Sequence, residues 1–176
     1  MAGGGHHPSV GGERLDHRNN GQALYTAEER RRRDESPWTI VQGVLAPVQF
    51  FVFLVSLSLV LRFLVTGQGA EAADISIVVK TLVLYAIMIT GSIWEKRVFD
   101  KWLFARPFFW EDVFSMLVLA LHTTYLYMLF GNHGTVGQRM VLALAAYATY
   151  LFNAGQFLLK LRAARIQAPP NLVAAG

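Results

Sequence analysis

The stretch FFWEDVFSMLVLALHTTYLYMLF, Phe108 to Phe130, decides the fold and raises the question of function. Its first turn carries two adjacent acids, Glu111 and Asp112. The rest is an apolar run close to the roughly 20 residues that cross a bilayer as a helix. His122 lies near the middle of that run. Ionisable side chains inside membrane helices are costly and by default functional, so these three residues are the first candidates for chemistry.

Three further apolar runs follow the same pattern, and the composition of the chain is typical of a small polytopic membrane protein. The four runs span residues 40–65, 75–94, 113–130 and 140–159. Of the 176 residues, 53% are hydrophobic and only 16% are charged, and the mean hydropathy is +0.35. Because unpaired backbone amides are not tolerated in lipid, each run predicts a helix. We therefore predict an all-α fold, a bundle of four transmembrane helices that forms one domain over residues 24–167.

The two ends of the chain lack this apolar character. Residues 1–23 are rich in Gly and His and predict a disordered tail, and residues 168–176 predict a short C-terminal tail. The first apolar run is too long and starts too late to predict a cleavable signal peptide. Cysteine is absent, which excludes thiolate catalysis and disulfides.

The basic residues form three clusters along the chain, and the loops that follow the first and the third apolar runs carry few of them. Of the 16 Lys and Arg residues, six precede Trp38, four lie between the second and third runs, and three follow the fourth run. The positive-inside rule then predicts that both termini and the middle loop face the cytoplasm. Topology and contacts with lipid headgroups account for these clusters, so we predict membrane lipid as a partner and no nucleic acid.

With that topology, polar residues from all four helices fall in the cytoplasmic half of the bundle. They are Gln42, Gln49, Glu95, Glu111, Asp112, Asn153, Gln156 and Lys160. Buried amides and acids cost several kcal/mol when unpaired, so they should face one another. The sequence therefore predicts a polar pocket that opens toward the inner leaflet.

One stripe on the third helix joins the acids to the histidine. Glu111, Ser115, Val118 and His122 follow the spacing of a single helix face. Eleven residues at 1.5 Å per residue place His122 about 16 Å from Glu111, so the two side chains can contact only opposite parts of one large flat ligand.

Simpler interpretations exist for each of these residues. Acids in a first turn also complement the helix dipole, and a single buried histidine is often only a packing residue. Asn153 and Gln156 can simply form hydrogen bonds between helices. Lys80 is placed one turn inside the outer end of the second helix, so we expect it to extend to the headgroups and leave it out of the site.

Four long blocks resemble one known family. They are VQGVLAPVQFFVFLVSLSLVLRFL, IVVKTLVLYAIMITGSIWEKRVF, FFWEDVFSMLVLALHTTY and LALAAYATYLFNAGQFLLKLRAAR. Together they resemble the vinyl bacteriochlorophyllide hydratases of phototrophic bacteria, over about residues 24–167. The resemblance implies a hydro-lyase of bacteriochlorophyll biosynthesis in the bacterial inner membrane. Its substrate would be a magnesium chlorin such as chlorophyllide a, whose 3-vinyl group becomes a 1-hydroxyethyl group.

For that reaction the residues suggest carboxylic general acid and base catalysis without a cofactor. A proton must reach the terminal vinyl carbon and water the inner carbon, and a carboxyl group can serve either step. Glu111, Asp112 and Glu95 are the candidates, with the choice of acid and base left open. His122 is a candidate ligand of the chlorin magnesium or an alternative base.

The remaining candidates would bind the pigment. Phe109 and Trp110 offer a stacking surface, and Arg106 or Lys101 can pair with the free propionate of a chlorophyllide. Ser115, Asn153, Gln156 and Gln49 would line the pocket. Neighbouring enzymes of the pathway are candidate partners that hand over the pigment.

Rival functions use the same residues differently. A pigment carrier or assembly factor would need His122 and the pocket but no proton chemistry. A proton-coupled transporter would use Glu95, Glu111 and Asp112 as a relay, although no repeat or broken helix pair supports one. A haem subunit would lack paired axial ligands, since the other four histidines lie outside the apolar runs.

Overall fold

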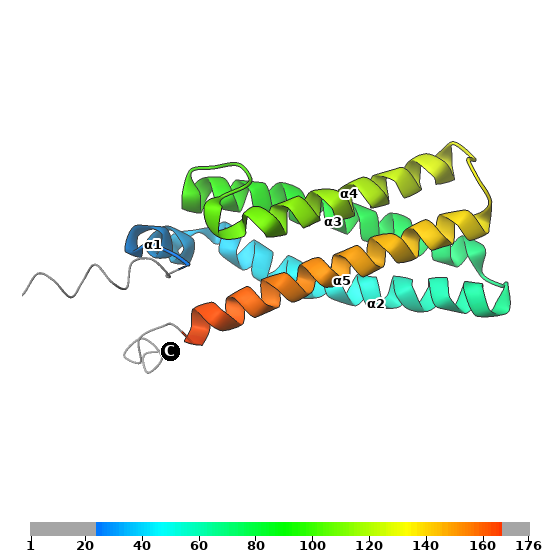
Figure 1. The fold of residues 1–176 in the computed structure, drawn as a ribbon, viewed down its shortest axis with the longest axis horizontal. Coiled ribbons are helices and arrows are strands. Elements are labelled where there is room, and N and C mark those ends of the chain that lie inside the picture. The colour runs from blue at the N-terminus through cyan, green and yellow to red at the C-terminus, as the bar shows by residue number, and fades with distance from the viewer. Residues whose placement is uncertain (1–23, 167–176) are drawn as a thin grey trace, which may run out of the picture.

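All elements that the structure describes are helical (Figure 1). The computed structural model describes residues 24–166, and the predicted tails therefore lie outside the described residues. The elements are α1 (Ala27–Glu35), α2 (Pro37–Thr66), α3 (Ala70–Phe99), the short 3-10 helix η1 (Arg106–Phe108), α4 (Phe109–Phe130) and α5 (Val136–Ile166). Four of these helices, α2 to α5, are long and apolar enough to cross a membrane. The predicted all-α, four-helix membrane architecture is confirmed.

The long helices continue past the apolar runs from which they were predicted. α3 begins at Ala70 rather than Ile75 and ends at Phe99 rather than Trp94. Gly67 and Gly69, both with positive φ, make the tight turn between α2 and α3. Polar end residues such as Glu71 and Glu95 are therefore part of α3, and residues near the start of this helix lie farther from its end than the apolar run alone implies.

The bundle is built from two helical hairpins. α2 packs along α3 and α4 packs along α5, and the hairpins meet where α3 contacts α4 and α2 contacts α5. The four helices run side by side along the long axis, with α1, the α3–α4 loop and the C-terminal end of α5 at one end (Figure 1). We call this the α1 end, and we call the end with the α2–α3 and α4–α5 turns the opposite end.

The interior and exterior faces follow helical spacing. On α3 the buried residues are Ala73, Ile77, Lys80, Thr81, Leu84, Glu95 and Val98. The outward faces expose large apolar side chains such as Ile40, Val65 and Leu158, which suit contact with acyl chains. One apolar core, with Phe53, Ile77 and Tyr147, fills the centre and the opposite end of the bundle.

A smaller aromatic core closes the α1 end and holds α1 against the bundle. The ring of Tyr25 is 5.8 Å from that of Phe99 and 6.3 Å from that of Phe108, and the Arg33 guanidinium lies 4.9 Å from its centre. Burial raises the pKa of the Tyr25 hydroxyl. Thr26 and Glu29 form a capping box at the start of α1, so this short helix is fixed at both its cap and its aromatic anchor.

We expect Tyr25→Ala to detach α1 from the bundle, because the substitution removes the aromatic contacts that hold it. The run Arg30–Arg33 should then be cleaved faster by trypsin in detergent-solubilised protein, as read by mass spectrometry. Tyr127→Ala is the matched control, since Tyr127 is 67% exposed at the opposite end. Equal cleavage rates in both variants would contradict an anchoring role for Tyr25.

Candidate functional site

Two carboxyl groups from different helices meet at the α1 end. Glu95 lies near the end of α3 and is 6% exposed, and Asp112 lies in the first turn of α4 and is 4% exposed. Their side chains are within hydrogen-bonding reach of each other. A hydrogen bond between two carboxyl groups requires a proton on one of them. The pair is therefore suited to hold one proton that either group can carry.

The α3–α4 loop fixes both carboxyl groups through its backbone. The N–H of Phe104 donates to Oδ2 of Asp112 at 2.7 Å, and the N–H of Ala105 donates to Oε2 of Glu95 at 3.2 Å. Phe104 adopts φ of 60°, a conformation that a bulky residue rarely takes and that clusters at functional sites. The loop is thus bent so that two consecutive N–H groups point at the pair.

Glu111 faces a different partner from its neighbour Asp112. Its Oε1 is 2.5 Å from Nζ of Lys160 on α5, and its Oε2 is buried without a partner among the described residues. Lys160 also donates to the carbonyl of Pro107 and lies 5.1 Å from the centre of the Phe108 ring. Consecutive helix residues point about 100° apart, which explains why the two acids separate. We call Glu95, Glu111, Asp112 and Lys160 the carboxyl cluster.

Below the cluster, a polar seam runs between α4 and α5. Nδ2 of Asn153 donates to Oγ of Ser115 at 2.8 Å. The side-chain oxygens of Asn153 and Gln156 are buried and have no partner within residues 24–166. The seam therefore leaves acceptors for a further donor, and its Ser115 lies one helical turn after Glu111 on α4.

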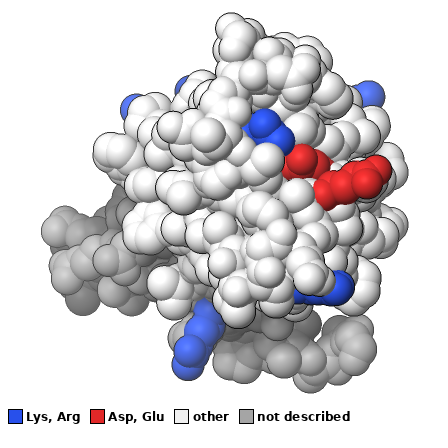
Figure 2. Space-filling model, turned by 90° about the vertical axis from the view of Figure 1, so that its right-hand side faces the viewer, with Lys and Arg blue, Asp and Glu red and all other residues white. Residues whose placement is uncertain are grey.

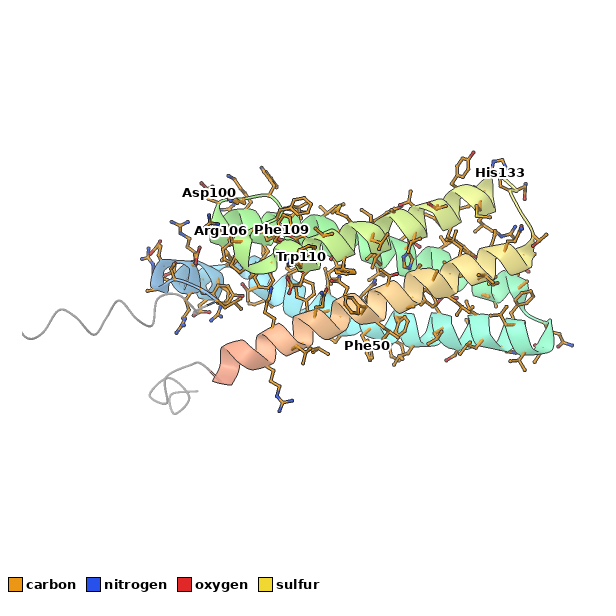
Figure 3. All side chains as sticks on the ribbon, in the orientation of Figure 1. Phe50, Asp100, Arg106, Phe109, Trp110 and His133 are labelled. Atoms are coloured by element: carbon orange, nitrogen blue, oxygen red, sulfur yellow. The ribbon has the colours of Figure 1, made fainter. Side chains whose placement is uncertain are left out.

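An exposed aromatic patch lies beside the carboxyl pair. It consists of Trp102, Phe104, Phe109 and Trp110, which are between 40% and 64% exposed. The ring of Phe109 is 5.7 Å from Phe104 and 5.6 Å from Trp110. Arg106 and Lys101 are exposed in the same loop region, and Phe109, Trp110 and Arg106 all lie at the α1 end (Figure 3). This surface combines flat apolar rings with cations at its edge.

Two predicted site residues lie away from this end, in the middle of the bundle. His122 is 1% exposed and Gln49 is 2% exposed. Nδ1 of His122 is 2.8 Å from the carbonyl oxygen of Val118, which can only accept, so Nδ1 carries the hydrogen and Nε2 is a free acceptor. Because Nε2 is fully enclosed, a macrocycle could reach it only if the helices separated.

The expectation that Lys80 extends to the headgroups is wrong. Lys80 is fully buried and its ammonium lies 4.1 Å from the centre of the Tyr150 ring. Since α3 starts at Ala70, ten residues or about 15 Å separate Lys80 from the helix start, which is too far for its side chain. Its spacing from Ala73, Ile77 and Leu84 is the signal that would have placed it on the interior face.

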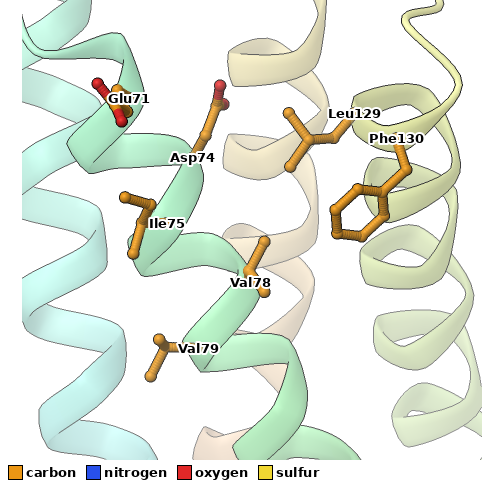
Figure 4. A pocket seen from close by; sticks show the side chains of 7 residues that line it. All are labelled: Glu71, Asp74, Ile75, Val78, Val79, Leu129 and Phe130. Carbon is orange, nitrogen blue, oxygen red and sulfur yellow. The ribbon is translucent and has the colours of Figure 1, made fainter.

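Neither of two surface cavities is lined by a residue of the carboxyl cluster. A groove of about 580 Å³ opens at the opposite end between α3 and α4, lined by Glu71, Asp74, Ile75, Val78, Val79, Leu129 and Phe130 (Figure 4). Seen from this end, the acidic side chains gather in one place on a mainly uncharged surface (Figure 2). Asp74 there accepts a hydrogen bond from the Tyr125 hydroxyl and pairs with Arg139 at 3.5 Å.

A smaller cavity of about 280 Å³ lies near α1 and is lined by Arg32, Glu35, Ser36, Pro37, Trp38 and Arg97.

The predicted polar residues thus form separate groups rather than one pocket. Glu95, Glu111 and Asp112 come together at the α1 end, with the Ser115–Asn153–Gln156 seam beside them. Gln49 and His122 belong to the bundle centre, and the candidates Phe109, Trp110, Arg106 and Lys101 belong to the surface. The pairing of Lys160 with Glu111 was not predicted, because sequence spacing does not show which residues face each other across two helices.

The fold and the cluster define a small four-helix membrane protein with buried carboxyl groups at one end. The family model described as 2-vinyl bacteriochlorophyllide hydratase matches residues 25–163, and the chain belongs to this family. A 2-vinyl bacteriochlorophyllide hydratase of Rhodobacter capsulatus is 65% identical over 84% of this chain and 85% of the relative. One of Cereibacter sphaeroides is 62% identical over 81% of this chain and 89% of the relative. No solved structure matches the chain.

We expect Lys160→Met to destabilise the protein by about 1–3 kcal/mol, because it leaves the buried carboxylate of Glu111 without its charged hydrogen-bond partner. Unfolding in a denaturing detergent would measure this loss.

The double variant Lys160→Met/Glu111→Gln is the control for that experiment. It removes the unpaired charge and should recover part of the stability. If the stability losses of the two single substitutions simply add in the double variant, the ion pair does not stabilise the protein as inferred.

Proposed function

We propose that this protein adds water to the 3-vinyl group of a magnesium chlorin, chlorophyllide a or a vinyl bacteriochlorophyllide, and yields the 1-hydroxyethyl product. Membership in the hydratase family supports the reaction class. The observation that carries the proposal is the buried contact between Glu95 and Asp112 beside an exposed aromatic patch. The protein would act as a hydro-lyase at the membrane surface.

A carboxyl pair that holds one proton has the two groups that hydration needs. The protonated carboxyl donates its proton to the terminal vinyl carbon, and the resulting cation is delocalised into the macrocycle. Water then bonds to the inner carbon and gives up a proton to the carboxylate that remains. The pair starts and ends with one proton, and one vinyl chlorin and one water combine into one product, so the proposed chemistry needs no redox partner. Either residue of the pair can be the first proton donor.

The aromatic patch provides a surface for the pigment. A flat ring system can stack on Phe109 and Trp110, while Arg106 or Lys101 pairs with the propionate of the substrate. The backbone of Phe104 links the patch to the pair, because its N–H binds Asp112. A chlorin on the patch would therefore lie next to the proton donor.

The charge distribution supports a membrane placement for this reaction. The α1 end carries Arg30–Arg33, Lys96, Arg97, Lys101 and Arg106, and by the positive-inside rule this charge supports a location on the cytoplasmic side of the bacterial inner membrane. A chlorin made on that side could reach the patch along the lipid headgroups. Transfer from neighbouring enzymes of the pathway remains a prediction.

We expect Glu95→Gln and Asp112→Asn each to lower the hydration rate at least about 100-fold, because the loss of one carboxyl removes general acid or base catalysis. Hydration takes the vinyl group out of conjugation, so the long-wavelength absorption band of chlorophyllide a should move blue with wild-type protein and stay in place with the variants.

Asp100→Asn is the matched control for these variants. Asp100 is exposed in the same loop region and the hydrogen bond from Lys96 lowers its pKa, so the substitution removes a charge without touching the pair. Full activity in both site variants would overturn the role of the pair. Wild-type protein that binds and releases pigment with no blue shift would favour the pigment carrier instead.

We expect Phe109→Leu to weaken pigment binding about 5- to 10-fold, since loss of aromatic stacking costs roughly 1 kcal/mol. Binding can be measured by quenching of pigment fluorescence in detergent or nanodiscs. Phe50→Leu is the control, because Phe50 is also 44% exposed but lies on α2 and faces outward. If instead Ile75→Trp, which fills the groove at the opposite end, abolishes binding while Phe109→Leu does not, the pigment lies in that groove.

A further inference from the structure

Three buried polar side chains in the middle of the bundle carry atoms that have no hydrogen-bond partner in the part of the chain that the structure describes. They are Lys80 on α3, His122 on α4 and Gln49 on α2, which are 0%, 1% and 2% exposed. The unpaired atoms are Nζ of Lys80, Nε2 of His122 and both amide atoms of Gln49. Unsatisfied buried groups of this kind cost several kcal/mol in an apolar interior. A ligand that pairs them would remove this cost.

The three side chains surround one aromatic cluster. Nζ of Lys80 lies 5.4 Å from the centre of the Tyr147 ring, and the His122 ring lies 5.9 Å from the same ring. Gln49 is one helical turn before Phe53, whose ring is 5.4 Å from that of Tyr147. Residues from α2, α3, α4 and α5 therefore line the same part of the bundle interior around Tyr147.

Neighbouring polar groups are already occupied. Ser76 Oγ donates to the carbonyl of Ala73, so the hydroxyl of Ser56 must donate to Ser76 at 2.7 Å. The hydroxyl of Tyr147 must then donate to Ser56 at 2.5 Å. The aromatic faces of Tyr150, Tyr147 and Phe53 favour a cation at Lys80 but cannot accept all of its N–H groups.

The unpaired groups differ in what they require. Lys80 offers donors, His122 Nε2 offers an acceptor because its Nδ1 hydrogen is bound to Val118, and Gln49 offers both. A carboxylate could not satisfy the lone pair of His122, and a metal cation would be repelled by a charged Lys80. A ligand that donates and accepts at the same atom can form a hydrogen bond with each of the three side chains, and water is the smallest such molecule.

We propose that Lys80, His122 and Gln49 enclose a bound water molecule in the centre of the bundle. Buried waters in proteins typically make about three hydrogen bonds to polar groups that otherwise lack partners. This interior water site is separate from the carboxyl cluster, since Lys80 and Glu95 are fifteen residues, or about 22 Å, apart along α3. The site stands on its own side chains and does not depend on the proposed hydration reaction.

Solid-state NMR of full-length protein labelled with ¹⁵N-histidine and reconstituted in lipid tests this site. His122 Nε2 should appear as an unprotonated nitrogen with a cross-peak to water protons, assigned by its loss in His122→Phe. Lys80→Met and Gln49→Leu should each weaken that cross-peak severalfold, and either variant suffices if the other fails to fold. Thr81→Val is the matched control, because Thr81 is fully buried beside Lys80 but its hydroxyl binds Ile77.

Two results would overturn the site. One is a His122 Nε2 without any water cross-peak in wild-type protein. The other, in protein labelled at lysine as well, is a direct coupling through a hydrogen bond between His122 Nε2 and Lys80 Nζ, which would mean that the two side chains satisfy each other. Both measurements are made without pigment, so they leave the proposed hydration reaction to its own tests.

Discussion

The structure depends on one constraint: polar groups carried into a membrane bundle must find partners on other helices. Glu95 and Asp112 satisfy it by meeting between α3 and α4, and the loop between these helices bends to supply two N–H donors. Glu111 satisfies it through Lys160 on α5. These contacts join α3, the α3–α4 loop, α4 and α5, so the acids that suit chemistry also connect the elements of the α1 end.

Buried polar groups toward the centre and at the opposite end also find partners on other helices, through other networks. Ser56, Ser76 and Tyr147 link α2, α3 and α5 through a chain of hydroxyl groups. Asp74, Tyr125 and Arg139 join α3, α4 and α5 at the opposite end. Lys80 and Gln49 lie on the α1 side of this hydroxyl chain along their helices, and their Nζ and amide atoms, like Nε2 of His122, have no partner among the described residues. The bundle therefore has polar layers at three depths, and the proposed water molecule belongs to the middle one.

For function, the position of the carboxyl cluster matters as much as its composition. Glu95 and Asp112 are shielded from water, yet the exposed rings of Phe109 and Trp110 are close by along the chain and at the same end of the bundle. A pigment that stays in the lipid phase can approach such a surface without entering the bundle. This arrangement suits a hydratase that acts on a large apolar substrate with a small reactive substituent.

The sequence by itself determined the four helices, their class and the family, because apolar runs of bilayer length admit only a helix and the matching blocks are long. It also determined the buried face of α4, since Glu111, Ser115, Val118 and His122 are all buried as their spacing predicted. Only the tertiary structure decided the partners: Glu95 with Asp112, Glu111 with Lys160, and Lys80 among aromatic rings rather than at the headgroups. Periodicity fixes the face on which a residue lies, but its depth depends on where the helix begins and its partner depends on how the helices pack.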